Sequence, residues 1–342
     1  MCGRLAESLQ EGACGMSSGL MYAPGSSAPM EELEALCRVV EREGKIYATH
    51  MRNYSDKLIE AVDEQLQLAS RTGCRLQISH FQAVGARNWH LQAQALERIE
   101  AARVKGVDVG LDCYPYVRGS TVLTQVLPQW ALDGGTDAFL ARLRDPIERK
   151  TIARETEADL AQGWENIFIS AVGSLENRPL VGSSIVDAAE LRGCEPVEAA
   201  FDLLQEENGQ VNILEINQSE ENLRQVLTHA ESNIISDGFY VKGNPHPRLY
   251  GTFPFLLGEI ARDRKWLTLA EAIYKITALP AMRLNMRDRG RLAPGFHADV
   301  TVFDPAAIDG PANYENPTLP PAGIAHVFRS GKRIAGEKRS DC

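Results

Sequence analysis

A helix, a glycine and a buried strand follow one another three times between residues 29 and 113, and this repeat constrains the fold more than any other feature. The three strand-like stretches end near His50, His80 and Asp112, about thirty residues apart, which is close to the period of a βαβ unit. Repeats of this length build parallel sheets, which keep their chemistry at the carboxyl ends of the strands. The sequence therefore predicts an α/β fold in which His50 and His80 face one shared site.

The composition limits the classes of protein to which the chain can belong. Apolar residues make up 44% and charged residues 24% of the 342 residues, which suits a globular protein with a sizeable core. A net charge of −10 without a basic stripe argues against nucleic acid as a partner. No apolar stretch approaches the roughly 18 residues that cross a membrane, and no signal peptide is recognisable. The seven scattered cysteines contain no CxxC pair, so we expect reduced thiols in a cytoplasmic protein.

Beyond residue 113 the pattern is less regular. We expect helices over residues 137–144, 147–160, 185–191, 196–204, 219–229, 269–276 and 280–284, and strands over residues 166–171 and 233–236. From Gly290 onward, alternation and turn residues replace the helical pattern, with a strand over residues 298–304 and a hairpin around Ser330 and Gly331. We therefore divide the chain into a large domain, residues 1–289, and a small β domain, residues 290–342.

Three residues at predicted strand ends have the chemistry of a metal-dependent hydrolase. His50 and His80 suit zinc as neutral imidazoles. A single histidine is more often structural or solvated, but equivalent placement in consecutive units favours a common role because strand ends converge. Asp237 ends a later strand and could take a proton from metal-bound water and pass it to a leaving nitrogen. From spacing alone, an aspartate in a turn or at a helix start is the more common role.

Further polar and aromatic residues could contact a ligand. Residues 244–251 read as a stiff, proline-rich loop, in which Arg248 could hold a carboxylate with two parallel hydrogen bonds. On local grounds a surface arginine is the more common reading. Tyr114, Tyr116 and Ser120 follow the third strand and could line a pocket, although aromatic residues near a strand end are more often ordinary packing.

Short motifs over nearly the whole chain carry a family resemblance. They are Ser18-Gly19-Leu20, Thr49-His50-Met51-Arg52, Ile78-Ser79-His80, Asp112-Cys113-Tyr114-Pro115-Tyr116, Ser236-Asp237-Gly238, His246-Pro247-Arg248-Leu249-Tyr250-Gly251, Asp288-Arg289-Gly290 and Phe303-Asp304-Pro305. In this order they resemble the N-acyl-D-amino-acid deacylases (D-aminoacylases) of the amidohydrolase superfamily. Each motif is weak alone, and the specificity lies in the order of the set.

The resemblance implies a TIM-like (β/α)8 barrel with a small β-sandwich. Proteins of this family use zinc to hydrolyse the amide bond of an N-acyl-D-amino acid. By motif, His50 and His80 would be zinc ligands and Asp237 the catalytic acid and base. Arg248 would hold the substrate carboxylate. The side chains that would contact the substrate besides it are Tyr22, Tyr114 and Ser120.

Two departures from the family pattern modify these expectations. Gln82 stands where the family has a lysine, at a position that contacts substrate, and glutamine cannot supply a positive charge. The family's His-x-His motif and zinc-binding cysteine have no counterpart. The strands that match the last five of the barrel end near Ser17, His50, His80, Asp112 and Ser236, and the strand near Ile169 would belong to an insertion. We therefore expect an incomplete barrel with part of the β-sandwich, truncated at the N-terminus, and a zinc site short of ligands.

The function indicated by the sequence is zinc-dependent hydrolysis of N-acyl-D-amino acids, which are small-molecule substrates. An alternative among enzymes is an amidohydrolase acting on cyclic amides, such as a dihydroorotase or hydantoinase, but the loop that carries Arg248 favours the deacylase. A hypothesis of another class is a catalytically inactive fragment, or a subunit that needs a partner to complete the barrel.

Overall fold

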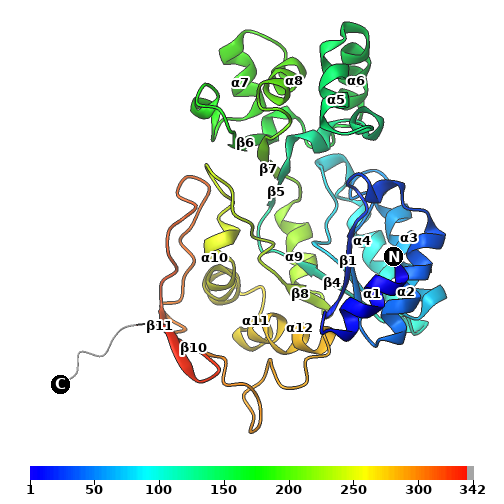
Figure 1. Ribbon diagram of the computed structural model, residues 1–342. Helices are drawn as coiled ribbons and strands as arrows, with labels where there is room; N and C mark the ends of the chain where they lie inside the picture. Colours follow the sequence, from blue (N-terminus) through cyan, green and yellow to red (C-terminus); the bar gives the residue numbers. More distant parts are fainter. Residues whose placement is uncertain (337–342) are drawn as a thin grey trace.

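A five-stranded parallel sheet forms the centre of the computed structural model, which describes residues 1–336 (Figure 1). Its strands lie in the order β1-β2-β3-β4-β8, and each neighbouring pair is parallel. Their bounds are β1, Gly15–Gly19; β2, Ile46–His50; β3, Arg75–Ile78; β4, Val109–Cys113; and β8, Ser232–Ile234. The sheet confirms the parallel α/β fold and contains the five strands matched to the barrel.

Helices that precede or connect these strands cover one face of the sheet, and in Figure 1 the first four are blue to cyan and the last is yellow-green. They are α1, Cys2–Gln10; α2, Met30–Arg42; α3, Leu58–Thr72; α4, Leu91–Val104; and α9, Glu220–Thr228. After α2, α3 and α4 the chain turns at Gly44, Gly73 and Gly106, each with a positive φ angle. Glycine adopts this conformation without strain because it has no Cβ. The predicted order of helix, glycine and strand is therefore confirmed in all three units.

A second unit, which we call the lobe, comprises residues 118–216 and lies beyond the carboxyl end of β4, in green in Figure 1. Its antiparallel sheet has the order β5-β7-β6 and is packed with four helices around its own hydrophobic core. The elements are β5, Arg118–Val122; α5, Thr136–Arg144; α6, Pro146–Asp159; β6, Ile167–Ala171; α7, Ile185–Arg192; α8, Pro196–Glu206; and β7, Asn212–Ile216. Strand β6 was expected in an insertion, whereas β5 and β7 have no counterpart among the expected elements.

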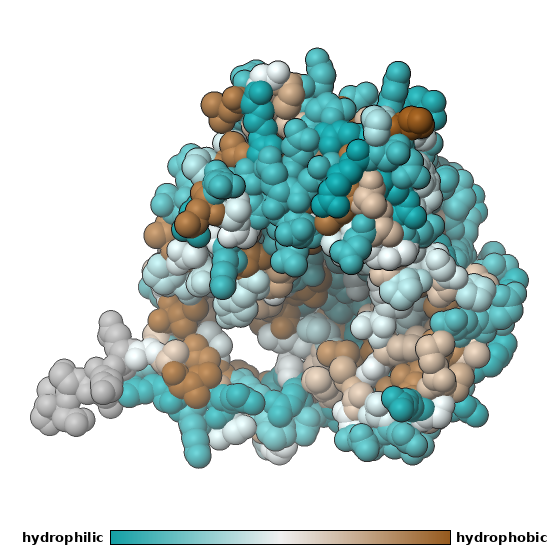
Figure 2. All heavy atoms as spheres, turned by 45° about the horizontal axis from the view of Figure 1, so that its top comes forward, coloured by the Kyte–Doolittle hydropathy of each residue, from teal (hydrophilic) through white to brown (hydrophobic). Residues whose placement is uncertain are grey.

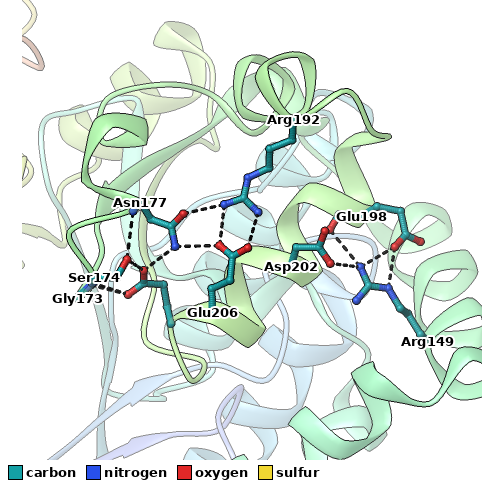
Figure 3. Close-up of polar contacts among 9 residues, drawn as sticks. Arg149, Gly173, Ser174, Asn177, Arg192, Glu198, Asp202 and Glu206 are labelled. Carbon is teal, nitrogen blue, oxygen red and sulfur yellow. Dashed lines mark hydrogen bonds and ion pairs between the residues drawn. The ribbon is translucent and has the colours of Figure 1, made fainter.

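Ion pairs on the surface of the lobe connect its helices (Figure 3). The Arg149 guanidinium on α6 contacts Glu198 and Asp202 on α8 at 2.6 and 2.7 Å. Arg192 at the end of α7 contacts Glu206 on α8 at 2.7 Å. The same arginine donates a hydrogen bond to the side-chain carbonyl of Asn177. These contacts fix α8 against its neighbours, and α8 leads directly toward the central strand β7.

The segment after β8 returns to helices and then forms a small antiparallel sheet, ordered β11-β10-β9. Its elements are α10, Arg248–Phe255; a π-helix, Leu256–Asp263; α11, Leu269–Ile276; α12, Ala278–Arg283; β9, Val300–Phe303; β10, Ile324–Arg329; and β11, Lys332–Gly336. The predicted hairpin around Ser330 and Gly331 is confirmed, and both residues have positive φ angles. The prediction of a loop over residues 244–251 is partly wrong. Helix α10 begins at Arg248, directly after Pro247, which ends the loop.

The structure tests several expectations for the whole chain only in part. The domain boundary at residue 290 stays a prediction, and the last six residues of the expected β domain lie outside the described residues. Six cysteines are free thiols, and Cys342 also lies outside the described range. Within residues 1–336, no helix is both long enough and apolar enough to cross a membrane.

Candidate active site

A cavity of about 590 Å³ lies between the carboxyl ends of the parallel strands and the lobe. Figure 2 shows a recess beneath the mostly hydrophilic surface of the lobe. Its volume is within the range of small-molecule sites. Eight of the nine residues named for the site line this cavity, and the ninth, Tyr116, is not part of its wall. The eight are Tyr22, His50, His80, Gln82, Tyr114, Ser120, Asp237 and Arg248. The fold therefore brings together side chains that are up to 226 residues apart in the sequence.

The two predicted ligand histidines face each other. His50 ends β2 and His80 follows β3, and their Nδ1 and Nε2 atoms are 2.8 Å apart. Burial lowers the pKa of both imidazoles, and the pKa of His50 falls to about 2, with His80 as a second cause. Both rings are therefore neutral at physiological pH, which is the form that binds a metal ion.

Buried groups around the histidines fix the two strand ends. The Tyr54 hydroxyl accepts a hydrogen bond from the Met51 amide at 2.9 Å and donates one to the Ser79 carbonyl at 3.0 Å. His80 has a positive φ of 35°, and its amide donates to Asp112 at 2.7 Å. Burial raises the pKa of this aspartate to about 6. Because a left-handed backbone strains a residue with a Cβ, the hydrogen bond to Asp112 stabilises the orientation of His80.

Asp237 and Arg248 form an ion pair in the cavity, with 3.0 Å between the carboxylate and the guanidinium. Arg248 is only 2% exposed and lies 4.6 Å from the centre of the Tyr114 ring. Its Nε atom has no hydrogen-bond partner among the described residues. The reading of Arg248 as a surface arginine is therefore wrong. Its position at the start of α10 leaves one buried N–H group able to bind an acceptor.

His246 holds the start of α10 in place. Its Nδ1 atom accepts a hydrogen bond from the Arg248 amide at 3.0 Å, so its Nε2–H donates to the Arg118 carbonyl at 2.9 Å. Burial keeps the pKa of this imidazole well below its usual value. The side chain therefore connects α10 to strand β5 of the lobe as a neutral group.

The remaining predicted residues form the polar wall of the cavity. Tyr22 lies 4.8 Å from the His50 ring centre to centre, and its hydroxyl is 3.4 Å from the Thr121 hydroxyl. The Tyr114 hydroxyl donates to Gln82 at 3.1 Å. Ser120 lies on β5 at the cavity wall. The side-chain carbonyl of Gln82 is thus satisfied by a neutral donor, and Gln82 adds no charge to the site.

The donor set fits zinc in kind but not in number. Two neutral imidazoles converge, yet no cluster of three or more histidine, cysteine, aspartate or glutamate residues able to hold a metal ion occurs within residues 1–336. Catalytic zinc sites use three protein ligands, and a tetrahedral ion holds two imidazole nitrogens about 3.3 Å apart. The pair would have to open slightly to hold zinc, and it would supply only part of the ligands.

The sequence did not indicate several residues that the structure places in the cavity. Glu215 and Asn217 lie on or beside β7, and Gln162 precedes β6. The signal for β7 was present in the alternating, β-branched stretch of residues 211–216. These side chains reach the cavity because β7 pairs with β5 and β6, which are distant from it in the sequence.

Comparison with known proteins assigns the chain to a family. Residues 30–335 match the amidohydrolase family. The chain belongs to this family. It is 36% identical over 327 residues to the N-acyl-D-glutamate deacylase of Alcaligenes xylosoxydans xylosoxydans, and the match covers 96% of this chain and 59% of that protein. It is 32% identical over 332 residues to the D-aminoacylase of the same organism, covering 97% of this chain and 60% of that protein.

A solved structure has a similar fold. The crystal structure of N-acyl-D-glutamate deacylase from Bordetella bronchiseptica, complexed with zinc and a phosphonate inhibitor, superimposes with a TM-score of 0.83 at 31% identity. This match covers 99% of the present chain and 63% of that chain. The present chain thus spans about 60% of the length of the curated relatives it matches. The resemblance to D-aminoacylases and the amidohydrolase fold of this family are confirmed.

Proposed function

We propose that this protein hydrolyses the amide bond of N-acyl-D-amino acids with zinc as its cofactor. The relatives with 32–36% identity are named as deacylases of this class, and a related structure contains zinc. The proposal rests on one observation. The ion pair of Asp237 and Arg248 and the histidine pair of His50 and His80 line the same cavity. This arrangement combines metal donors, a proton acceptor and a buried cation.

In the proposed reaction, Arg248 binds the α-carboxylate of the substrate. The guanidinium is buried, its Nε–H group has no partner within residues 1–336, and a charge-assisted contact in such a place is strong and directional. Tyr22, Tyr114 and Ser120 complete the wall around the bound substrate. Gln82 can donate or accept a hydrogen bond there but cannot balance a second carboxylate.

Asp237 is the proposed acid and base. Its side chain is 37% exposed, so it remains accessible from the cavity while Arg248 orients it. The carboxylate takes a proton from the attacking water and returns it to the amine that leaves. A zinc ion held in part by His50 and His80 would polarise the acyl carbonyl and increase the acidity of water.

Two alternatives are distinguished by specific features. A hydantoinase acts on a ring that contains the α-carboxyl carbon, so its substrate has no free α-carboxylate, and the buried Arg248 favours the deacylase over it. An inactive fragment, or a subunit completed by a partner, is favoured by the two-histidine donor set within residues 1–336. We also propose a division into barrel, residues 1–289, and β domain, residues 290–342, a cytoplasmic location and no nucleic-acid partner, on the composition and charge given above.

The test is turnover of linear and cyclic amides by the full chain with zinc added. We expect release of D-methionine from N-acetyl-D-methionine and no opening of a 5-substituted hydantoin. The variant Asp237→Ala should lose the activity. Turnover of the hydantoin alone would support the cyclic-amide hydrolase, and zinc binding without any turnover would support the inactive fragment.

A further inference from the structure

Glu215 is a carboxylate in the wall of the cavity that the proposed reaction does not use. It lies on β7, the central strand of the lobe sheet, and shares the cavity with Asp237 and Arg248. Within residues 1–336 it forms no ion pair. Burial raises the pKa of this carboxyl to about 7. A half-buried carboxylate without a cation is costly, so its presence here calls for a ligand that offsets the cost.

Two neutral amides fix the orientation of the Glu215 carboxylate. Gln162 donates from Nε2 to one carboxylate oxygen, and Asn217 donates from Nδ2 to the other at 3.3 Å. The Gly119 amide donates to the Asn217 side-chain carbonyl at 2.9 Å, which directs the Asn217 amide group toward Glu215. A carboxylate has about four acceptor sites. Both oxygens are therefore held in position while acceptor capacity remains toward the cavity.

The charge of the cavity wall favours a cation. Its carboxylates are Asp56, Asp159, Glu215 and Asp237, and its cationic side chains are Lys57 and Arg248. Arg248 is already paired with Asp237. Arg248 and Glu215 lie on different elements and line the same cavity as Tyr22 and Tyr114. A ligand in contact with these tyrosines therefore has an anion site at Arg248 and a cation site at Glu215.

We propose that Glu215 selects N-acyl-D-amino acids whose side chain carries a positive charge, such as those of D-lysine and D-arginine. This inference rests on the proposed function, because Arg248 must take the α-carboxylate for the side chain to reach the lobe. The ammonium or guanidinium group then donates to the oriented carboxylate in a charge-assisted hydrogen bond. A substrate with an acidic side chain meets a like charge and binds weakly.

The test measures equilibrium binding to the full chain by calorimetry, with three N-acetylated ligands that share the D configuration. N-acetyl-D-lysine carries a cation, N-acetyl-D-norleucine is a neutral analogue of similar length, and N-acetyl-D-glutamate carries an anion. We expect the lysine ligand to bind about tenfold more tightly than the norleucine ligand, and the glutamate ligand to bind most weakly. Glu215→Gln should remove the preference, because glutamine keeps the shape but not the charge. Glu198→Gln, an equal substitution outside the cavity, should keep it.

The outcomes separate this inference from the function on which it rests. A lysine preference that disappears in Glu215→Gln and persists in Glu198→Gln supports the inference. Binding of all three ligands with equal affinity, or a preference unchanged in Glu215→Gln, overturns it and leaves the proposed function standing. If no N-acetyl-D-amino acid binds to the wild type, both the inference and the proposed function are overturned. A fluorescence unfolding curve for each variant confirms that the compared chains are folded.

Discussion

The Asp237 carboxylate lies 3.0 Å from the guanidinium of Arg248, and this pair connects the proposed chemistry to the proposed substrate anchor. Arg248 is buried at the start of α10, whereas Asp237 follows β8 with a positive φ of 49°. A substrate carboxylate that binds Arg248 competes with Asp237 for the same cation. In the proposed reaction, binding of substrate therefore releases the Asp237 carboxylate from its ion pair with Arg248.

Replacement of Arg248 by methionine should weaken substrate binding. Loss of one partner from a buried charge pair costs about 2–5 kcal/mol, so we expect the KM for N-acetyl-D-methionine to rise at least about thirtyfold. Arg262→Met is the matched control, because Arg262 pairs with Asp263 at the surface. Steady-state kinetics on both variants checks the prediction, and an equal rise in KM for both would contradict it.

Replacement of Asp237 by asparagine should act mainly on the rate. Asparagine keeps the size of the side chain but accepts no proton, and proton transfer by a positioned group contributes about 10²–10⁴-fold. We expect steady-state kinetics to show kcat lower by this factor, with a smaller change in KM. A variant with the wild-type kcat would show that another group carries the proton.

Removal of either His50 or His80 should lower the zinc affinity of the chain. The two imidazoles converge to 2.8 Å and are neutral, so each supplies one donor. Equilibrium dialysis of His50→Ala and His80→Ala should show a loss of at least about tenfold in affinity. The control is His297→Ala, since His297 lies at the surface beside Asp288. An equal effect of all three substitutions would contradict the assignment.

Glu215 should make the free chain less stable as the pH rises. Its pKa of about 7 in the folded chain lies above the ordinary glutamate value of 4.5, so its contribution to stability is complete below 4.5 and is lost as the pH rises through 7. Relative to wild type, Glu215→Gln should gain stability between pH 4.5 and 8, on the order of 1–2 kcal/mol because the side chain is half-buried. Urea unfolding at both pH values measures this difference. A difference in unfolding free energy that stays constant from pH 4.5 to 8 would mean that Glu215 keeps its ordinary pKa, and it would contradict the prediction.

Local patterns predicted much of the sheet and its helices, because these depend on short-range periodicity. Gly73, for example, ends α3 with a φ of 73° and marks the next strand in the sequence. The same reasoning located His50 and His80, since strand ends in a parallel sheet converge. The burial of Arg248 could not be predicted from the local sequence, because it depends on the packing of α10 against Tyr114 and the lobe.

The lobe was the weakest part of the prediction. Strand β5 contains Gly119 and polar residues, and it pairs with β7 across an interval of about ninety residues. Such pairing cannot be derived from the period of either segment. The position of Glu215 in the cavity depends on this pairing, so a charged residue in a strand gave no indication of a ligand contact.

The central claim is most directly tested by the stereochemistry of hydrolysis in a sample of known zinc content. The purified full chain is incubated with zinc, its bound metal is quantified, and release of methionine is followed from N-acetyl-D-methionine and from its L enantiomer. We predict hydrolysis of the D enantiomer alone, dependent on bound zinc and absent in Asp237→Ala. Equal hydrolysis of both enantiomers, or no hydrolysis of either by the zinc-loaded chain, would contradict the account.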